Sequence, residues 1–171
     1  DMRAVLMRMS EYIRKEDRED YTGTCFHKLQ ADIDIGKKQA YAYMNNTFFQ
    51  ESKYFIAYMN MREQQTIVLK DVYKKIISIH MFLPQTDQVA DLFYEIGVTF
   101  GESNNARALL ARLEEVLSQM KSSQLPVTRQ EFEARAVLYG ILLDLEYFLR
   151  LKKEFADALT QEQIRRYWHG E

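Results

Sequence analysis

The sequence contains few of the residues that interrupt regular structure. Its 171 residues include six glycines and two prolines, too few for a sandwich or barrel built from many short strands and turns. The alternation of apolar and polar residues that is typical of half-buried strands is absent throughout. Runs rich in Glu, Gln, Lys, Arg, Leu, Met and Ala favour helices instead. We therefore predict an all-α protein, an elongated antiparallel bundle of about five to six helices.

Cysteine, net charge and long apolar runs are also scarce. A single cysteine, Cys25, excludes an intramolecular disulfide and suits a reducing compartment. The net charge of −2, with basic residues scattered among acidic ones, gives no sign of a nucleic-acid partner. The most apolar run, residues 136–149, is interrupted by Asp144 and Glu146, so it is not a membrane span. We expect a soluble polypeptide and, because it opens with Asp1 and not Met, a fragment of a longer protein.

No pattern points to catalysis or to a bound cofactor. His27, His80 and His169 are far apart, and none follows an acidic residue at the spacing of a di-iron bundle. Zinc-ligand spacings and glycine-rich phosphate loops are missing as well. We predict that the chain is not an enzyme, that it has no catalytic, cofactor-binding or metal-binding residues, and that its histidines lie at the surface or at helix ends.

Apolar stripes at the helical period run along the whole chain, without a linker, and predict one domain over residues 1–171. Thr128 and Thr160 each stand three residues before a Glu or Gln, which is the spacing of a capping box. Pro84 is expected to stop the helix before it. The expected helical segments are 2–13, 25–44, 51–83, a short helix after Thr86, 106–120, 128–159 and a last short helix over 160–168.

Two charged residues fall on apolar helix faces. Asp144 shares a face with Phe148, and Arg62 lies near Tyr58. Because a charge removed from water needs a partner, we favour a buried ion pair between Arg62 and Asp144 that fixes the register of their helices. The alternative is that Arg62 binds an aromatic carboxylate while tyrosines enclose its ring. Glu146 has a local partner four residues on, in Arg150.

Two sequence blocks resemble a known family. One is Tyr54–Gln65, YFIAYMNMREQQ, an aromatic-rich segment that leads into Met-Arg-x-x-Gln. The other is Leu125–Phe155, with Leu-Pro-x-Thr-Arg-x-Glu-Phe-Glu-x-Arg-Ala followed by Leu-Tyr, Asp-Leu-Glu and Leu-Lys. In content, order and spacing these blocks resemble the C-terminal cytosolic domain of the aromatic acid exporters, a family of bacterial membrane proteins.

The resemblance implies a cytoplasmic domain at the cell membrane, following a multi-span membrane region, with residues 1–20 as the helix after that region. It implies an accessory or regulatory role through self-association or through coupling to the membrane part. The implied partners are other copies of the chain, its own N-terminal membrane region and aromatic carboxylates. The alternative function is a free-standing cytoplasmic helical protein-interaction module without a transport role. The candidate positions for a buried charge or ligand are Arg62, Gln65, Asp144 and Glu146, with Tyr54, Tyr58 and Tyr139 as aromatic lining.

Overall fold

The computed structural model describes residues 1–15, 22–46 and 49–168, and the regular structure within these ranges is entirely helical, as predicted. Seven helices are present there, so the predicted number of five to six is too low. The helices are α1 (Met2–Ile13), α2 (Cys25–Asn46), α3 (Phe49–Ile77), α4 (Pro84–Thr99), α5 (Arg107–Ser122), α6 (Arg129–Asp157) and α7 (Gln161–Tyr167).

The two predicted capping boxes define where α6 and α7 begin. The Thr128 hydroxyl accepts the Glu131 N–H at 3.1 Å, and the Glu131 carboxylate accepts the N–H of Val127, one residue before the position expected for a capping box. Thr160 and Gln163 cap each other reciprocally, at 3.2 and 2.9 Å. Because the second box starts a new helix after the turn that ends α6, α7 is a separate element, in agreement with the short helix expected over 160–168.

The end of α3 differs from the prediction. The helix ends at Ile77, six residues before Leu83, and Pro84 is the first residue of α4 and not the stop of α3. A proline suits a first helical position because its fixed φ is already helical and its missing N–H would have no partner there. Thr86 caps α4 from inside this first turn, where its hydroxyl accepts the Leu83 N–H at 3.1 Å.

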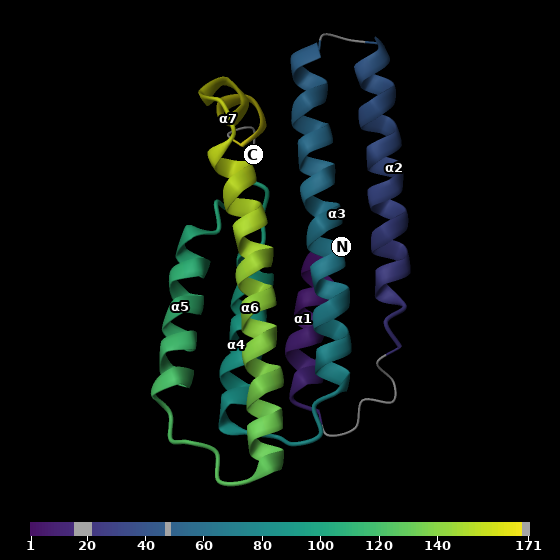
Figure 1. Cartoon of the computed structure of the whole chain (residues 1–171). Coiled ribbons are helices and arrows are strands. Elements are labelled where there is room, and N and C mark those ends of the chain that lie inside the picture. Colours follow the sequence, from purple (N-terminus) through teal and green to yellow (C-terminus); the bar gives the residue numbers. More distant parts are fainter. Residues whose placement is uncertain (16–21, 47–48, 169–171) are drawn as a thin grey trace.

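Helices α3 and α6 lie side by side at the centre of the bundle, and the others pack around them (Figure 1). They are antiparallel, because Tyr54 near the start of α3 meets Phe155 near the end of α6, while Lys75 near the end of α3 pairs with Asp144. Helix α2 covers α3 on one side, α5 covers α6 on the other, and α1 and α4 lie behind the central pair.

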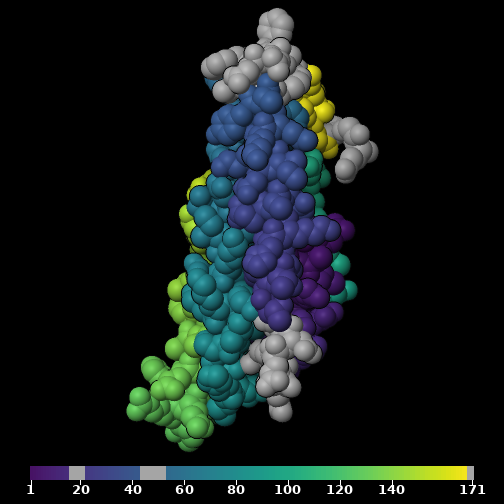
Figure 2. Space-filling view, turned by 90° about the vertical axis from the view of Figure 1, so that its right-hand side faces the viewer, coloured from purple at the N-terminus to yellow at the C-terminus, as the bar shows by residue number. Residues whose placement is uncertain are grey.

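The outer helix pairs are antiparallel as well, and the molecule is elongated (Figure 2). In the α1–α4 pair, Arg3 donates to the Phe100 carbonyl at 2.9 Å, and Ser10 donates to the Ala90 carbonyl at 2.7 Å. In the α2–α3 pair, Lys37 and Glu63 form an ion pair at 2.9 Å. The predicted antiparallel bundle is therefore the observed arrangement.

The buried residues form one large apolar core and a smaller aromatic one. The large core joins α1 to α6 and includes fully buried Phe93 and Phe148. The smaller core lies where α3, α6 and α7 meet, around Tyr54, Met61 and Phe155. No helix in the described ranges combines the length and the apolar character needed to cross a membrane.

Two adjacent residues of α4 provide a test of this packing. Phe93 is fully buried and Tyr94 is half exposed. We expect Phe93→Ala to lower the free energy of unfolding by about 3–5 kcal/mol, because it removes buried apolar contacts and leaves a cavity. Tyr94→Ala is the matched control, with an expected change within about 0.5 kcal/mol. Urea unfolding of the two variants measures both values, and similar losses would contradict the orientation of α4.

Candidate functional site

The Arg62 guanidinium is buried among aromatic rings and not opposite a carboxylate. Its side chain is 7% exposed, and its central carbon lies 4.8 Å from the centre of the Tyr58 ring and 4.4 Å from that of Phe100. Both distances are within the range of a cation–π interaction. Within the described ranges, Arg62 forms no ion pair with an acidic side chain. Its charge is therefore stabilised by ring faces and by a neutral amide.

That amide belongs to Gln65, which links α3 to α6. The Gln65 side chain is 0% exposed; its Oε1 accepts from Arg62 at 2.9 Å, and its Nε2 donates to the Phe148 carbonyl at 2.9 Å. With both ends of the amide bonded, Gln65 fixes the position of Arg62 relative to the backbone of α6.

A pocket of about 240 Å³ opens beside Arg62, and we call it the Arg62 pocket. Apolar side chains and the Tyr58 and Phe100 rings form most of its wall, and the carboxylates of Asp1 and Asp32 are its acidic groups. The complete lining is Asp1, Met2, Leu29, Asp32, Ile33, Tyr58, Met59, Arg62 and Phe100. The pocket is thus mostly apolar, with a single cationic side chain.

A second buried cation, Lys152 of α6, lies near Arg62. Its side chain is 4% exposed, and its Nζ donates to the Glu102 backbone carbonyl at 2.6 Å. Burial, followed by repulsion from Arg62, lowers the pKa of Lys152 to about 7, against a weaker opposing effect of the Glu102 charge. Like Arg62, Lys152 forms no ion pair with a carboxylate among the residues that the structure describes.

Aromatic side chains surround Lys152, and we call this group the Lys152 cage. The ammonium lies 5.3 Å from the Trp168 ring centre, 5.5 Å from that of Phe155 and 5.9 Å from that of Tyr58. The cage comprises Lys152, Tyr54, Tyr58, Phe155, Tyr167 and Trp168. Two of its polar atoms are buried without a hydrogen-bond partner in the described structure, the Tyr54 hydroxyl and the Trp168 Nε1. Burial raises the pKa of Tyr54, and the two side chains are close enough for Trp168 to oppose that rise, although the pair falls outside hydrogen-bonding geometry.

The predicted ion pair between Arg62 and Asp144 is wrong. Asp144 pairs with Lys75 of α3 at 2.6 Å, and this pair is only partly buried, with 26% of the Asp144 side chain exposed. The physical reason is the register of α3 against α6. Arg62 lies level with Phe148 and Lys152, so Asp144 falls further along α3, beside Lys75. An ion pair between α3 and α6 exists, but its basic residue is Lys75 and not Arg62.

The other candidates divide between the site and the rest of the bundle. Glu146 pairs with Arg150 at 2.5 Å, as predicted, and this local pair lies away from the Arg62 pocket. Tyr54 and Tyr58 belong to the Lys152 cage, and Tyr58 also lines the Arg62 pocket. Tyr139 packs on the large core instead. The structure therefore brings together Arg62, Gln65, Tyr54 and Tyr58, and leaves Asp144, Glu146 and Tyr139 outside.

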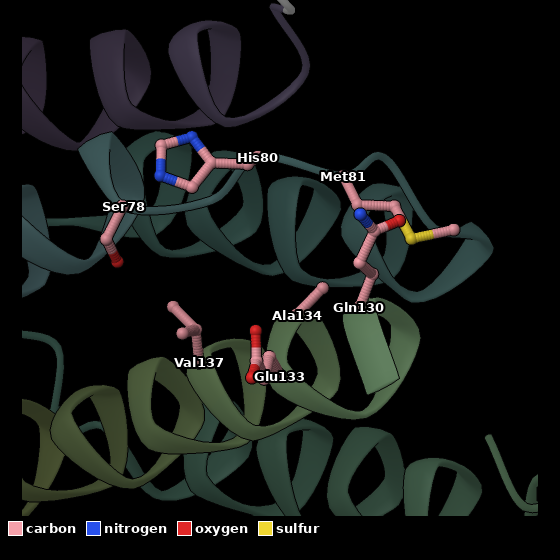
Figure 3. A pocket seen from close by; sticks show the side chains of 7 residues that line it. All are labelled: Ser78, His80, Met81, Gln130, Glu133, Ala134 and Val137. Atoms are coloured by element: carbon pink, nitrogen blue, oxygen red, sulfur yellow. The ribbon is translucent and has the colours of Figure 1, made fainter. Parts of the chain in front are cut away.

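A larger pocket, of about 350 Å³, lies between the chain after α3 and the start of α6. In Figure 3, Ser78 and His80 lie on one side of it and Glu133, Ala134 and Val137 on the other. His80 and His27 are exposed, as predicted, while His169 lies outside the described residues. The described ranges contain no group of three His, Cys, Asp or Glu that could hold a metal ion.

Sequence reasoning missed Lys152, Phe100 and the aromatic end of the chain. Lys152 had a visible signal, because it occupies the apolar face of α6 between Phe148 and Phe155. Phe100 had none, since it reaches Arg62 only through the packing of α4 against α1 and α6.

The fold and site define a helical bundle domain with two buried cations beside a small, mostly apolar pocket. A family model described as "Putative aromatic acid exporter C-terminal domain" matches residues 1–153. The chain belongs to this family, which confirms the resemblance of the two sequence blocks.

Individual proteins are similar to this chain as well. The uncharacterized protein YqjA of Bacillus subtilis (strain 168) is 27% identical over 146 residues, which cover 85% of this chain and 45% of that protein. The chain thus spans less than half the length of this relative. A crystal structure described as a putative membrane protein from Clostridium difficile 630 superposes with a TM-score of 0.81 and 28% identity, covering 92% of this chain and 91% of the other.

The Gln65 link can be tested against the exposed ion pair between the same two helices. We expect Gln65→Leu to lower the free energy of unfolding by about 1–3 kcal/mol, because the buried Arg62 N–H loses its acceptor and the Phe148 carbonyl loses a donor. Asp144→Asn is the control, with a loss of less than about 1 kcal/mol, since its pair with Lys75 is partly in water. Chemical denaturation measures both, and equal losses would refute the link.

Lys152 predicts how stability depends on pH. Its pKa is about 7 in the fold against 10.5 for an unperturbed lysine, so between these values the unfolded chain binds more protons than the folded one. The free energy of unfolding should therefore rise with pH above 7, by at most about 1.4 kcal/mol per pH unit from this group.

The measurement is urea unfolding of the natural chain and Lys152→Met between about pH 7 and pH 9, below the usual pKa of tyrosine. The variant has no ammonium to deprotonate, so the part of the pH dependence that comes from this group should disappear. If the free energy of unfolding changed with pH by the same slope in both proteins, Lys152 would titrate as an ordinary lysine.

Proposed function

We propose that the chain is the cytoplasmic regulatory domain of an aromatic acid exporter, and that it binds an aromatic carboxylate in the Arg62 pocket. The single observation that supports binding is Arg62 itself, a buried guanidinium between two rings that forms no ion pair with a carboxylate among the described residues. A carboxylate ligand would supply the anionic partner, in the planar geometry that guanidinium groups bind best.

The pocket lining indicates how the ligand would lie. The carboxylate group would face Arg62, because the acidic side chains of Asp1 and Asp32 would repel it elsewhere. The ring would lie against the apolar side chains of the pocket, beside the Tyr58 and Phe100 rings. The volume of about 240 Å³ is below the range of about 300–1,000 Å³ typical of pockets for drug-sized ligands, so an acid with one ring suits it.

The first residues of the chain offer a route for coupling to a membrane part. Asp1 and Met2 line the pocket, and Arg3 donates to the carbonyl of Phe100, which is itself a wall of the pocket. In the proposed arrangement the membrane region precedes α1, so ligand in the pocket would touch the segment that leads from the membrane. Self-association of the domain is the second proposed mode of action, and sedimentation of the chain with and without ligand distinguishes the two.

The ligand proposal is tested by calorimetric titration of the chain with sodium benzoate and with benzamide. Benzoate should bind saturably and benzamide at least about tenfold more weakly, because only the former carries a charge for Arg62. Arg62→Gln should lose the preference for benzoate, whereas Arg129→Gln, at a highly exposed arginine, should keep it. Equal binding of the two compounds, or no binding of either, would exclude an aromatic carboxylate as the ligand.

The membrane proposal is tested on the full-length natural gene product with a tag at its C-terminus. We expect it in the membrane fraction after washing with salt and alkali, because spanning helices would hold it there. A soluble product of about the size of this chain would favour the alternative function, a free-standing helical interaction module.

A further inference from the structure

The Lys152 cage has two features that the Arg62 pocket does not explain. Its ammonium is almost fully buried and forms no ion pair with a carboxylate within the described ranges. Buried charges are ordinarily paired, since the removal of an ion from water is energetically unfavourable. The ammonium donates a hydrogen bond to the carbonyl of Glu102, a neutral acceptor, and the nearby charge of Glu102 offsets the burial of the ammonium only in part.

Two buried donors belong to the same aromatic cluster, and the ring of one of them, Trp168, lies beside the ammonium. The Tyr54 hydroxyl and the Trp168 Nε1 are buried and have no hydrogen-bond partner in the described structure. Tyr54 is 4% exposed, so water does not reach it freely. Buried donors without acceptors are rare in folded proteins and call for a specific explanation. A cation and two unpartnered donors in one aromatic enclosure are complementary to an oxyanion.

We infer that the Lys152 cage is a binding site for a small oxyanion of the carboxylate or bicarbonate type, held by the Lys152 ammonium, the Trp168 N–H and the Tyr54 hydroxyl. Arg62, which repels Lys152, adds positive potential from the side of α3. This site does not depend on the proposed function, because its ligand needs no aromatic ring and its donors do not line the Arg62 pocket.

Helix α7 gives the oxyanion a way in. Tyr167 stacks on Tyr54 at 4.1 Å and meets Phe55 edge to face at 5.3 Å, so rings hold the end of α7 over the cage. Tyr167 and Trp168 are only partly buried, so both rings of the cage that come from the end of α7 are in part accessible to solvent. A shift of these rings would admit a small ion without rearranging α3 or α6.

Anion binding at this site should be linked to proton uptake. The charged groups near the Lys152 ammonium are Arg62 from α3 and Glu102 from the segment before α5, and the neighbouring phenols are those of Tyr54, Tyr58 and Tyr167. A bound anion favours the charged form of the Lys152 ammonium, so the complex binds more protons than the free protein does. The affinity for formate should therefore change little below pH 7 and fall up to about tenfold per pH unit above it.

The experiment uses the single tryptophan of the chain, Trp168, as a fluorescent reporter within the cage. Sodium formate, and separately sodium bicarbonate, replaces sodium chloride at constant ionic strength at about neutral pH. We expect a saturable change in Trp168 emission, and a thermal unfolding midpoint that rises with the oxyanion concentration. A response to formate would show that the site accepts a carboxylate. A response to bicarbonate but not to formate would show that the site selects bicarbonate.

Variants assign the response to the cage. Lys152→Met should weaken formate binding by at least about tenfold, and Tyr54→Phe, which keeps the ring stack, by several-fold. Lys121→Met, at an exposed lysine of α5, is the matched control and should bind as the natural chain does. If Lys152→Met fails to fold, Tyr54→Phe and the pH dependence of formate binding decide the question.

Three outcomes would overturn the inference. One is the absence of any saturable change with formate or bicarbonate. Another is unchanged affinity in both cage variants. The third is an affinity that does not fall above pH 7, or a bicarbonate response that grows with pH, because the latter would indicate carbamate formation on the neutral amine. Failure of benzoate binding in the Arg62 pocket would leave these results unaffected, so the two proposals fail separately.

Discussion

The contact between α3 and α6 is the constraint on which the rest of this bundle depends. These two long helices form the centre, and every other helix packs on one or both of them or on a helix that does. Gln65 bridges them within the core, where its amide is bonded at both ends. A shift of this register by one turn would remove that bridge and separate Arg62 from the level of Phe148 and Lys152.

The same register places two like charges near each other inside the molecule. Arg62 and Lys152 come from different helices and approach the same tyrosine ring, that of Tyr58. Their mutual repulsion and burial oppose folding, while ring faces and the large apolar core offset that cost. Proteins commonly retain such unfavourable local arrangements where a ligand or a conformational change makes use of them. This is the physical reason why the proposed ligand sites lie at the two buried cations and not at the exposed ion pairs.

The sequence predicted the helices well because apolar periodicity reports directly on which face of a helix is buried. The starts of α6 and α7 followed from Thr128 and Thr160, whose capping depends only on residues a few positions away. The end of α3 was less predictable, because Pro84 can either stop one helix or start the next.

The site was only partly predictable. Arg62 stood out as a charge on an apolar stripe, but its environment depends on the register of α3 against α6 and on the packing of α4, which periodicity does not encode. The ion-pair partner of Asp144 was therefore predicted to be Arg62 when it is Lys75, and the contact of Phe100 with Arg62 was not predicted. The burial of Lys152 could have been predicted, since the helical periodicity of α6 alone places this residue on the apolar face.

The region matched by the family model ends at residue 153, and this boundary runs through the site. Arg62, Phe100 and Lys152 lie before it, whereas Phe155, Tyr167 and Trp168 lie after it. The Arg62 pocket is therefore built wholly from the part of the fold that the family model describes. The cage takes its outer wall from the C-terminal tail, so two chains with the same bundle and different tails would share the pocket and differ in what surrounds the lysine.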